Sequence, residues 1–185
     1  MRRMKLKERI KRWSASHGHG VHSPLAFRLI EHVVRPPRSV VYYGEERLKA
    51  MPDLAGIQLR RARMLLRLTA ELQPSRVWLS PKASQSLEES VRFAGEVIRI
   101  FDGKIYPNEA ESADLIVFDG GKANFKLLNR LVEAEKNVIA FGWKPRELNK
   151  VESLMKGGVL LNGVESFIMI NRQGEELHKY NISKF

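Results

Sequence analysis

The sequence of 185 residues contains no cysteine. This absence excludes disulfide bonds, thiolate zinc sites and cysteine nucleophiles, and it is typical of proteins that work in a reducing cytoplasm. No stretch approaches the roughly 20 apolar residues that a transmembrane helix needs. The N-terminus is basic, but no unbroken apolar run follows it. We therefore expect a cytoplasmic protein without a secretory signal.

Glycine is missing from a long central part of the chain, between Gly56 and Gly95. Within this part begins a unit that we expect to fold as strand, loop, helix and strand. Its four segments are Arg76–Leu79, Ser80–Ser84, Gln85–Ala94 and Glu96–Phe101. Such a unit is the nucleus of a parallel α/β sheet, in which a ligand sits over the loop after the first strand. That loop reads SPKAS and lacks the glycine that would let the backbone approach a ligand closely.

The rest of the chain extends this unit into an α/β domain, residues 74–185, preceded by a basic helical cap, residues 1–73. We expect further helices at 24–34, 45–51, 57–72, 124–136 and 146–156, and further strands at 115–119, 137–141, 164–171 and 176–183. Ser23 and Pro24 form a helix start, and Gly157 with Gly158 reads as a helix C-cap. A tight turn at Gln173 and Gly174 predicts that the last two strands form an antiparallel hairpin.

Positive charge is concentrated in the first third of the chain. Residues 1–67 hold 16 Lys and Arg against 5 Asp and Glu, an excess that equals the net charge of +11 of the whole protein. Such a local excess indicates an anionic partner, namely RNA, an acidic protein or a membrane surface. A solubilising tail is the alternative. The candidate anion-binding residues are Arg2, Arg3, Lys5, Lys7, Lys11 and Arg12.

The first thirteen residues predict an amphipathic helix, with Leu6, Ile10 and Trp13 on one side. We expect this apolar stripe to pack on the protein's own domain, although such a helix could also lie on an anionic membrane or on RNA. The helix at 57–72 carries four arginines that we expect to form its solvated side, with phosphate contact as the alternative. These are Arg60, Arg61, Arg63 and Arg67.

Three histidines follow the first helix, His17, His19 and His22. Imidazole is a common zinc ligand, but no Asp, Glu or Cys stands nearby to complete a site. A divalent metal likewise needs clustered oxygen ligands, which the segment FGWKPRE after the strand at 137–141 does not supply. We therefore predict no metal site.

Several segments resemble one protein family. They are HGVHSPLAFRLIEHVV, which ends at Val34, the Tyr42-Tyr43 piece with Glu45 and Arg47, LLRLTAELQPSRVW, FDGG and the terminal GVESFIMINRQGEELHKYNISKF. Together with the alternating strands and helices, they resemble the class I S-adenosylmethionine-dependent methyltransferases, in particular a bacterial O-methyltransferase-like group. The resemblance implies a Rossmann-like methyltransferase fold with a mostly parallel sheet.

The resemblance also implies where S-adenosylmethionine would bind. The corresponding positions are Ser80, Ala83, Ser84, Asp102, Asp119 and Gly120. Asp102 stands where the family binds the ribose hydroxyls, although an Asp-Gly pair is also a common turn. Asp119 stands near the family's substrate position, or is an N-cap. The SPKAS loop departs from the family's glycine-rich loop, and the chain between Asp102 and Asp114 is too short for a helix and a third strand.

Three hypotheses follow. The first, which we favour, is a methyltransferase-like protein that has lost its cofactor site and acts by binding a partner. The second is an active methyltransferase with an unusual cofactor loop, which would rely on Asp102 and Asp119. The third is a protein that binds RNA or an anionic surface through its basic N-terminus. A sheet with one exposed edge could also pair with a second copy of the chain.

Overall fold

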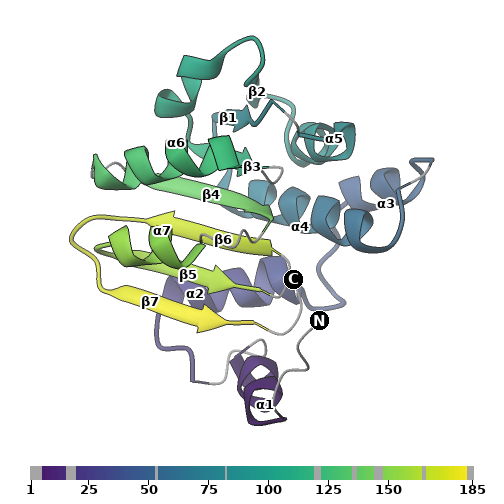
Figure 1. Ribbon diagram of the computed structural model, residues 1–185. Coiled ribbons are helices and arrows are strands. Elements are labelled where there is room, and N and C mark those ends of the chain that lie inside the picture. The colour runs from purple at the N-terminus through teal and green to yellow at the C-terminus, as the bar shows by residue number, and fades with distance from the viewer. Residues whose placement is uncertain are drawn as a thin grey trace.

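The computed structural model describes residues 6–15, 20–52, 54–81, 83–118, 122–134, 137–143, 148–163 and 166–182. In these residues, a single sheet carries helices on both faces (Figure 1). Its strands are β1 (Arg76–Leu79), β2 (Arg99–Asp102), β3 (Leu115–Phe118), β4 (Val138–Trp143), β5 (Gly158–Asn162), β6 (Ser166–Asn171) and β7 (Leu177–Asn181). The α-helices are α1 (Leu6–Ala15), α2 (Pro24–Leu29), α3 (Gly44–Lys49), α4 (Gly56–Leu72), α5 (Gln85–Ala94), α6 (Lys122–Glu133) and α7 (Leu148–Leu154).

Two helices of other types complete the fold. A π-helical turn, η1 (Ile30–Val34), continues α2, and a short 3-10 helix, η2 (Pro107–Ser112), precedes β3. The expected helix at 24–34 is therefore present, with a change of winding after Leu29. Its predicted start is confirmed, because Ser23 Oγ accepts a hydrogen bond from the Ala26 N–H at 3.3 Å. No helix in the described ranges has the length and apolarity to cross a membrane.

The strands lie in the order β2-β1-β3-β4-β6-β5-β7. Six of them run in one direction, and β6 alone runs against both of its neighbours. The predicted α/β class with a mostly parallel sheet is therefore confirmed. Residues 103–114, all of which are described, form η2 and no strand, so β2 lies at an edge of the sheet.

The end of the sheet differs from the expected arrangement. We expected the strands now seen as β6 and β7 to pair as an antiparallel hairpin, but β5 lies between them. The hairpin is formed instead by β5 and β6, while β7 pairs in parallel with β5. The prediction failed because Gly157 and Gly158 read as a helix C-cap, so that β5 was not recognised as a strand.

The two glycines serve the sheet rather than a helix end. A Cβ at Gly157 would lie 2.2 Å from the Glu175 carbonyl oxygen, and one at Gly158 only 2.0 Å from the Ile170 carbonyl oxygen. Gly158 also has a φ of +101°, which disfavours other residues. The chain between β6 and β7 thus passes close over the start of β5, and only glycine leaves room for it.

The two faces of the sheet hold separate hydrophobic clusters. On one face, residues of α2, α4 and α5 pack against the strands, and on the other, residues of α6, η2 and the end of α7 do so. Residues of the N-terminal third share the first cluster with strand residues, as Leu29 and Leu65 do with Val77. The helices α2 and α4 and the sheet are therefore held by one continuous core, whereas Leu48 of α3 packs with Leu66 of α4 in a third cluster.

Candidate functional site

A ligand of an open α/β sheet binds outside the carboxyl ends of the strands, at the point where the strand order reverses. Here the order reverses at β1, which has β2 on one side and β3 on the other. Leu79, the last residue of β1, is paired with Asp102 of β2 and Val117 of β3. This register places the loops that follow β1 and β2 next to each other.

The loop after β1 is bonded within the protein. Ser80 is 2% exposed; its N–H donates to the Val117 carbonyl at 2.9 Å, and its carbonyl accepts the Ala83 N–H at 2.8 Å. Ala83 is half-buried and packs against the core. Ser84 is exposed at the start of α5, with its Oγ 3.0 Å from Ser86 Oγ. The backbone amides of Ser80 and Ala83 thus already have partners.

Asp102 shapes the turn that follows β2. Its Oδ1 accepts the Lys104 N–H at 2.8 Å, and its carbonyl accepts the N–H groups of Ile105 and Tyr106 at 3.0 and 2.8 Å. This is the turn-forming use of an Asp-Gly pair. One oxygen of the carboxylate expected to hold a ribose therefore accepts a hydrogen bond from the backbone of the same turn.

The loops after β1 and β2 are in direct contact at Gly103. A Cβ at this residue would lie 2.5 Å from Trp78 Cζ2, 2.7 Å from the Leu79 carbonyl oxygen and 2.9 Å from Pro81 Cδ. The Gly103 N–H donates to the same Leu79 carbonyl at 2.8 Å. The Trp78 indole donates to the Tyr106 carbonyl at 3.0 Å. There is consequently no room for a side chain at position 103, where the two loops meet.

The remaining cofactor positions follow β3. Asp119 and Gly120 lie outside the described residues. Just before them, Phe118 approaches the end of β4 so closely that a Cβ at Gly142 would lie 2.7 Å from Phe118 Cβ. The described part of this edge is therefore also tightly packed.

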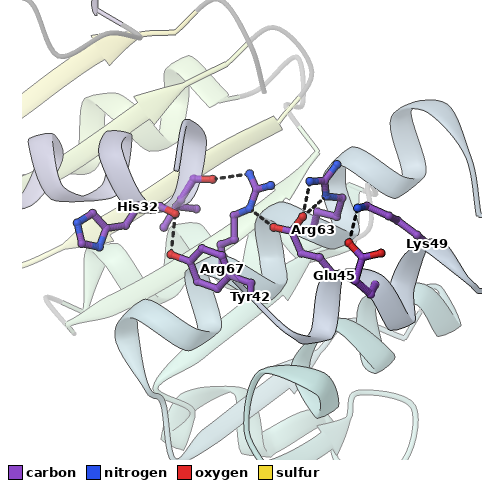
Figure 2. A network of polar contacts seen from close by, with 8 residues as sticks. His32, Tyr42, Glu45, Lys49, Arg63 and Arg67 are labelled. Atoms are coloured by element: carbon purple, nitrogen blue, oxygen red, sulfur yellow. Dashed lines mark hydrogen bonds and ion pairs between the residues drawn. The ribbon is translucent and has the colours of Figure 1, made fainter. Parts of the chain in front are cut away.

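A second polar region joins α3, α4 and η1, and its centre is Glu45 (Figure 2). This carboxylate is 7% exposed and forms ion pairs with Arg63 and, at 2.5 Å, with Arg67. Arg67 also donates to the Val33 carbonyl at 3.2 Å, and the Tyr42 hydroxyl donates to the His32 carbonyl at 2.9 Å. The network ties η1 and α3 to α4.

Two groups in this region have shifted pKa values. Burial alone would raise the pKa of Glu45, but the hydrogen bonds and charges of Arg67 and Arg63 outweigh it and hold this pKa below the ordinary value. Burial, followed by the nearby carboxylate of Glu71, raises the pKa of Tyr42. Glu45 is thus a charged, paired carboxylate, and its arginines are compensated rather than available for an anion.

The four arginines of α4 do not all form the solvated side that we expected. Arg60 is exposed, but Arg61 is 5% exposed, and the side chain of Arg67 is 13% exposed. For Arg63 and Arg67 the prediction failed because α3 packs against α4 and supplies the buried carboxylate of Glu45. The missed signal was the position of Arg61, because Arg60, Arg63 and Arg67 lie at i, i+3 and i+7 on one strip of the helix and Arg61 lies outside it.

The candidate anion-binding residues lie at the N-terminus. Lys7 and Lys11 are exposed on α1, and Arg12 belongs to the same helix. The other three, Arg2, Arg3 and Lys5, lie outside the described residues. The structure thus places a basic helix at the surface, beside β7 (Figure 1).

The apolar stripe of α1 does not pack on the domain as we expected. Leu6 is 68% exposed, and Ile10 and Trp13 are each 56% exposed. The helix instead turns another side to the protein, where Ala15 packs against the core and Glu8 is half-buried. The prediction failed because the pattern gives the faces of a helix but not which face the domain covers.

The histidine cluster is only partly described, because His17 and His19 lie outside the described residues. The backbone N–H of His22 donates to the Tyr180 hydroxyl at 3.2 Å. Among the described residues, no group of three or more His, Cys, Asp or Glu could hold a metal ion.

Comparisons with models of known protein families, with curated proteins and with solved structures gave no match to this chain. The residues and their geometry therefore carry the functional argument alone.

Proposed function

We propose that this chain is a methyltransferase-like protein that lacks a working S-adenosylmethionine site and acts by binding an anionic partner through its basic N-terminal third. The contact between Pro81 and Gly103 is the observation that supports this best. In a methyltransferase of this fold, the backbone after the first strand must approach the cofactor closely. Here the same backbone approaches the loop after β2.

The available groups also fit the cofactor poorly. A bound cofactor would need free backbone N–H groups near its carboxylate and a free carboxylate near its ribose. The N–H groups of Ser80 and Ala83 have partners within the protein, and Asp102 Oδ1 accepts the Lys104 N–H. A cofactor that used these groups would have to compete with these hydrogen bonds, each of which stabilises the protein by about 1 kcal/mol.

The distribution of charge supports a binding role. The excess of 11 positive charges lies in residues 1–67, while the rest of the chain is neutral. Within that region, Arg63 and Arg67 are paired with Glu45, so they add little to an outward field. The exposed lysines of α1 are therefore the better candidates for contact with an anion.

Isothermal titration of the purified full chain with S-adenosylmethionine and S-adenosylhomocysteine tests this proposal. We expect no heat of binding at millimolar cofactor. Binding at micromolar concentration would contradict the proposal, and the Asp102→Ala variant would then show how the cofactor is held. Loss of that binding in the variant would favour an active methyltransferase with an atypical loop.

A further inference from the structure

The apolar side of α1 is largely exposed, although the helix contacts β7 and its last residue, Ala15, packs against the core. Leu6, Ile10 and Trp13 are spaced at i, i+4 and i+7, so they share one side of the helix. Ala15 lies nine residues after Leu6, which places it on the opposite side, and it packs against the core. The apolar stripe, defined as Leu6, Ile10 and Trp13, therefore lies on the side of α1 opposite Ala15, and each of its residues is more than half exposed.

Positive charge borders this stripe. Lys7 and Lys11 each follow a stripe residue by one position and are exposed. The chain before α1 adds Arg2, Arg3 and Lys5, so the first twelve residues hold seven positive charges and one negative charge. Long basic side chains beside an apolar stripe can keep their charges at a polar boundary while their methylene groups stay in contact with apolar material.

We propose that α1 docks this protein on the surface of an anionic lipid bilayer. The inference names the partner of the proposed binding function and rests on that function. The apolar stripe would enter the boundary between the headgroups and the acyl chains, and the basic residues would contact the anionic headgroups. Trp13 suits this place because its ring is apolar and its indole N–H is polar.

The chemistry of the stripe favours lipid over RNA. RNA would be recognised by the basic residues and by stacking, and it offers nothing to cover two exposed aliphatic side chains such as Leu6 and Ile10. A bilayer offers both an anionic surface and an apolar layer beneath it. Neither signal is strong alone, and stable attachment of a peripheral protein commonly needs two.

Sedimentation with lipid vesicles tests the proposal on the full chain. Vesicles of phosphatidylcholine with about a third phosphatidylserine should bind the protein, and vesicles of phosphatidylcholine alone should bind it far more weakly. The Ile10→Glu variant should lose about ten-fold or more in affinity for the anionic vesicles. The doubly substituted Lys7→Glu, Lys11→Glu variant should lose about 25-fold or more.

Matched controls separate this helix from general effects of charge and hydrophobicity. Val97 is 91% exposed far along the chain, so Val97→Glu should leave vesicle binding unchanged. Lys104→Glu with Lys126→Glu removes the same charge from two other exposed positions and should have little effect. Circular dichroism and the thermal midpoint establish that every variant remains folded.

Tryptophan fluorescence gives a readout that charge alone would not change. Insertion of the Trp13 ring should shift the emission of the protein to shorter wavelength when anionic vesicles are added, and Trp13→Phe should remove this shift. The other two tryptophans, Trp78 and Trp143, contribute a background that is the same in both proteins. Binding without a shift, or a shift that persists in Trp13→Phe, would contradict docking through the stripe.

Two other outcomes would overturn the proposal. Binding of single-stranded RNA that survives Ile10→Glu, without vesicle binding, would make α1 a nucleic-acid contact. Self-association that Ile10→Glu abolishes, again without vesicle binding, would make the stripe an interface between copies of the chain. Neither outcome depends on the cofactor titration, so failure of the lipid proposal and failure of the closed cofactor site can be told apart.

Discussion

At the scale of single residues, Glu45 holds the N-terminal helices on α4. Its carboxylate is almost fully buried and lies between Arg63 and Arg67. Two buried or half-buried guanidinium groups without this carboxylate would repel each other and lose hydrogen bonds. Removal of one member of a buried ion pair is far more destabilising than removal of a surface pair.

Glu45→Ala should therefore lower the free energy of unfolding by about 3 kcal/mol, measured by urea denaturation. The neighbouring Glu46 is a matched control, because it pairs with Lys49 and its side chain is 75% exposed. Glu46→Ala should cost about 0.5 kcal/mol or less. Equal effects of the two variants would show that Glu45 does not have the buried, paired role described above.

The lowered pKa of Glu45 predicts a pH dependence of stability. Because its pKa is lower in the folded protein than the ordinary value of 4.5, its stabilisation is complete above that value and is lost as pH falls through the folded pKa. The difference in unfolding free energy between the wild type and Glu45→Gln should thus be constant near neutral pH and shrink in acid. A difference that grows as pH falls below 4.5 would contradict the assignment.

Residue types predicted some of these roles from sequence alone. Ser23 caps α2 as expected, since a serine before a proline is sufficient for a helix start. The burial of Arg67 was not predictable, because the pattern within α4 does not reveal that α3 packs against it. The partners of a long polar side chain depend on elements distant in sequence.

At the scale of elements, the contact between the loops after β1 and β2 is specified by one glycine. Gly103→Ala would place a Cβ within 3 Å of Trp78, Leu79 and Pro81, in each case at a ring or backbone atom rather than at the end of a flexible side chain. We expect this variant to lower the free energy of unfolding by about 2 kcal/mol in urea denaturation.

Gly95→Ala is the control for Gly103→Ala. A Cβ at Gly95 would meet the Ile98 side chain, 3.1 Å away at Cδ1, which can rotate to make room. Its effect should be about 0.5 kcal/mol or less. A Gly103→Ala protein as stable as this control would mean that the two loops separate easily, and a cofactor could then enter between them.

The elements themselves were predictable to different degrees. β1 and α5 occupy the expected residues 76–79 and 85–94, because a short apolar run and an amphipathic helix each give a clear local pattern. β2 begins at Arg99 rather than Glu96. The strand β5 was missed, because the short buried run of residues 159–161 after a pair of glycines has no periodicity that separates a strand from a helix end.

At the scale of the whole molecule, the net charge is unevenly distributed along the chain. Residues 68–185, which include the whole sheet, have no net charge, and the positive excess lies in residues 1–67. The core joins the two, since residues of α2 and α4 pack in the same cluster as the strands. A partner that binds α1 would consequently be held to the body through α1 and its contact with β7. The distribution of charge along the chain was fully predictable, since it depends only on the order of the residues.

The central claim is that S-adenosylmethionine does not bind at the loops that follow β1 and β2. Titration of the full chain with S-adenosylhomocysteine, followed by the amide signals in nuclear magnetic resonance spectra, tests this claim at the residues of the two loops. We predict that the amide signals of Ser80, Ala83 and Gly103 do not move at millimolar ligand, because each of these N–H groups already donates a hydrogen bond within the protein. Saturable shifts confined to these three amides would contradict the account and indicate a working cofactor site.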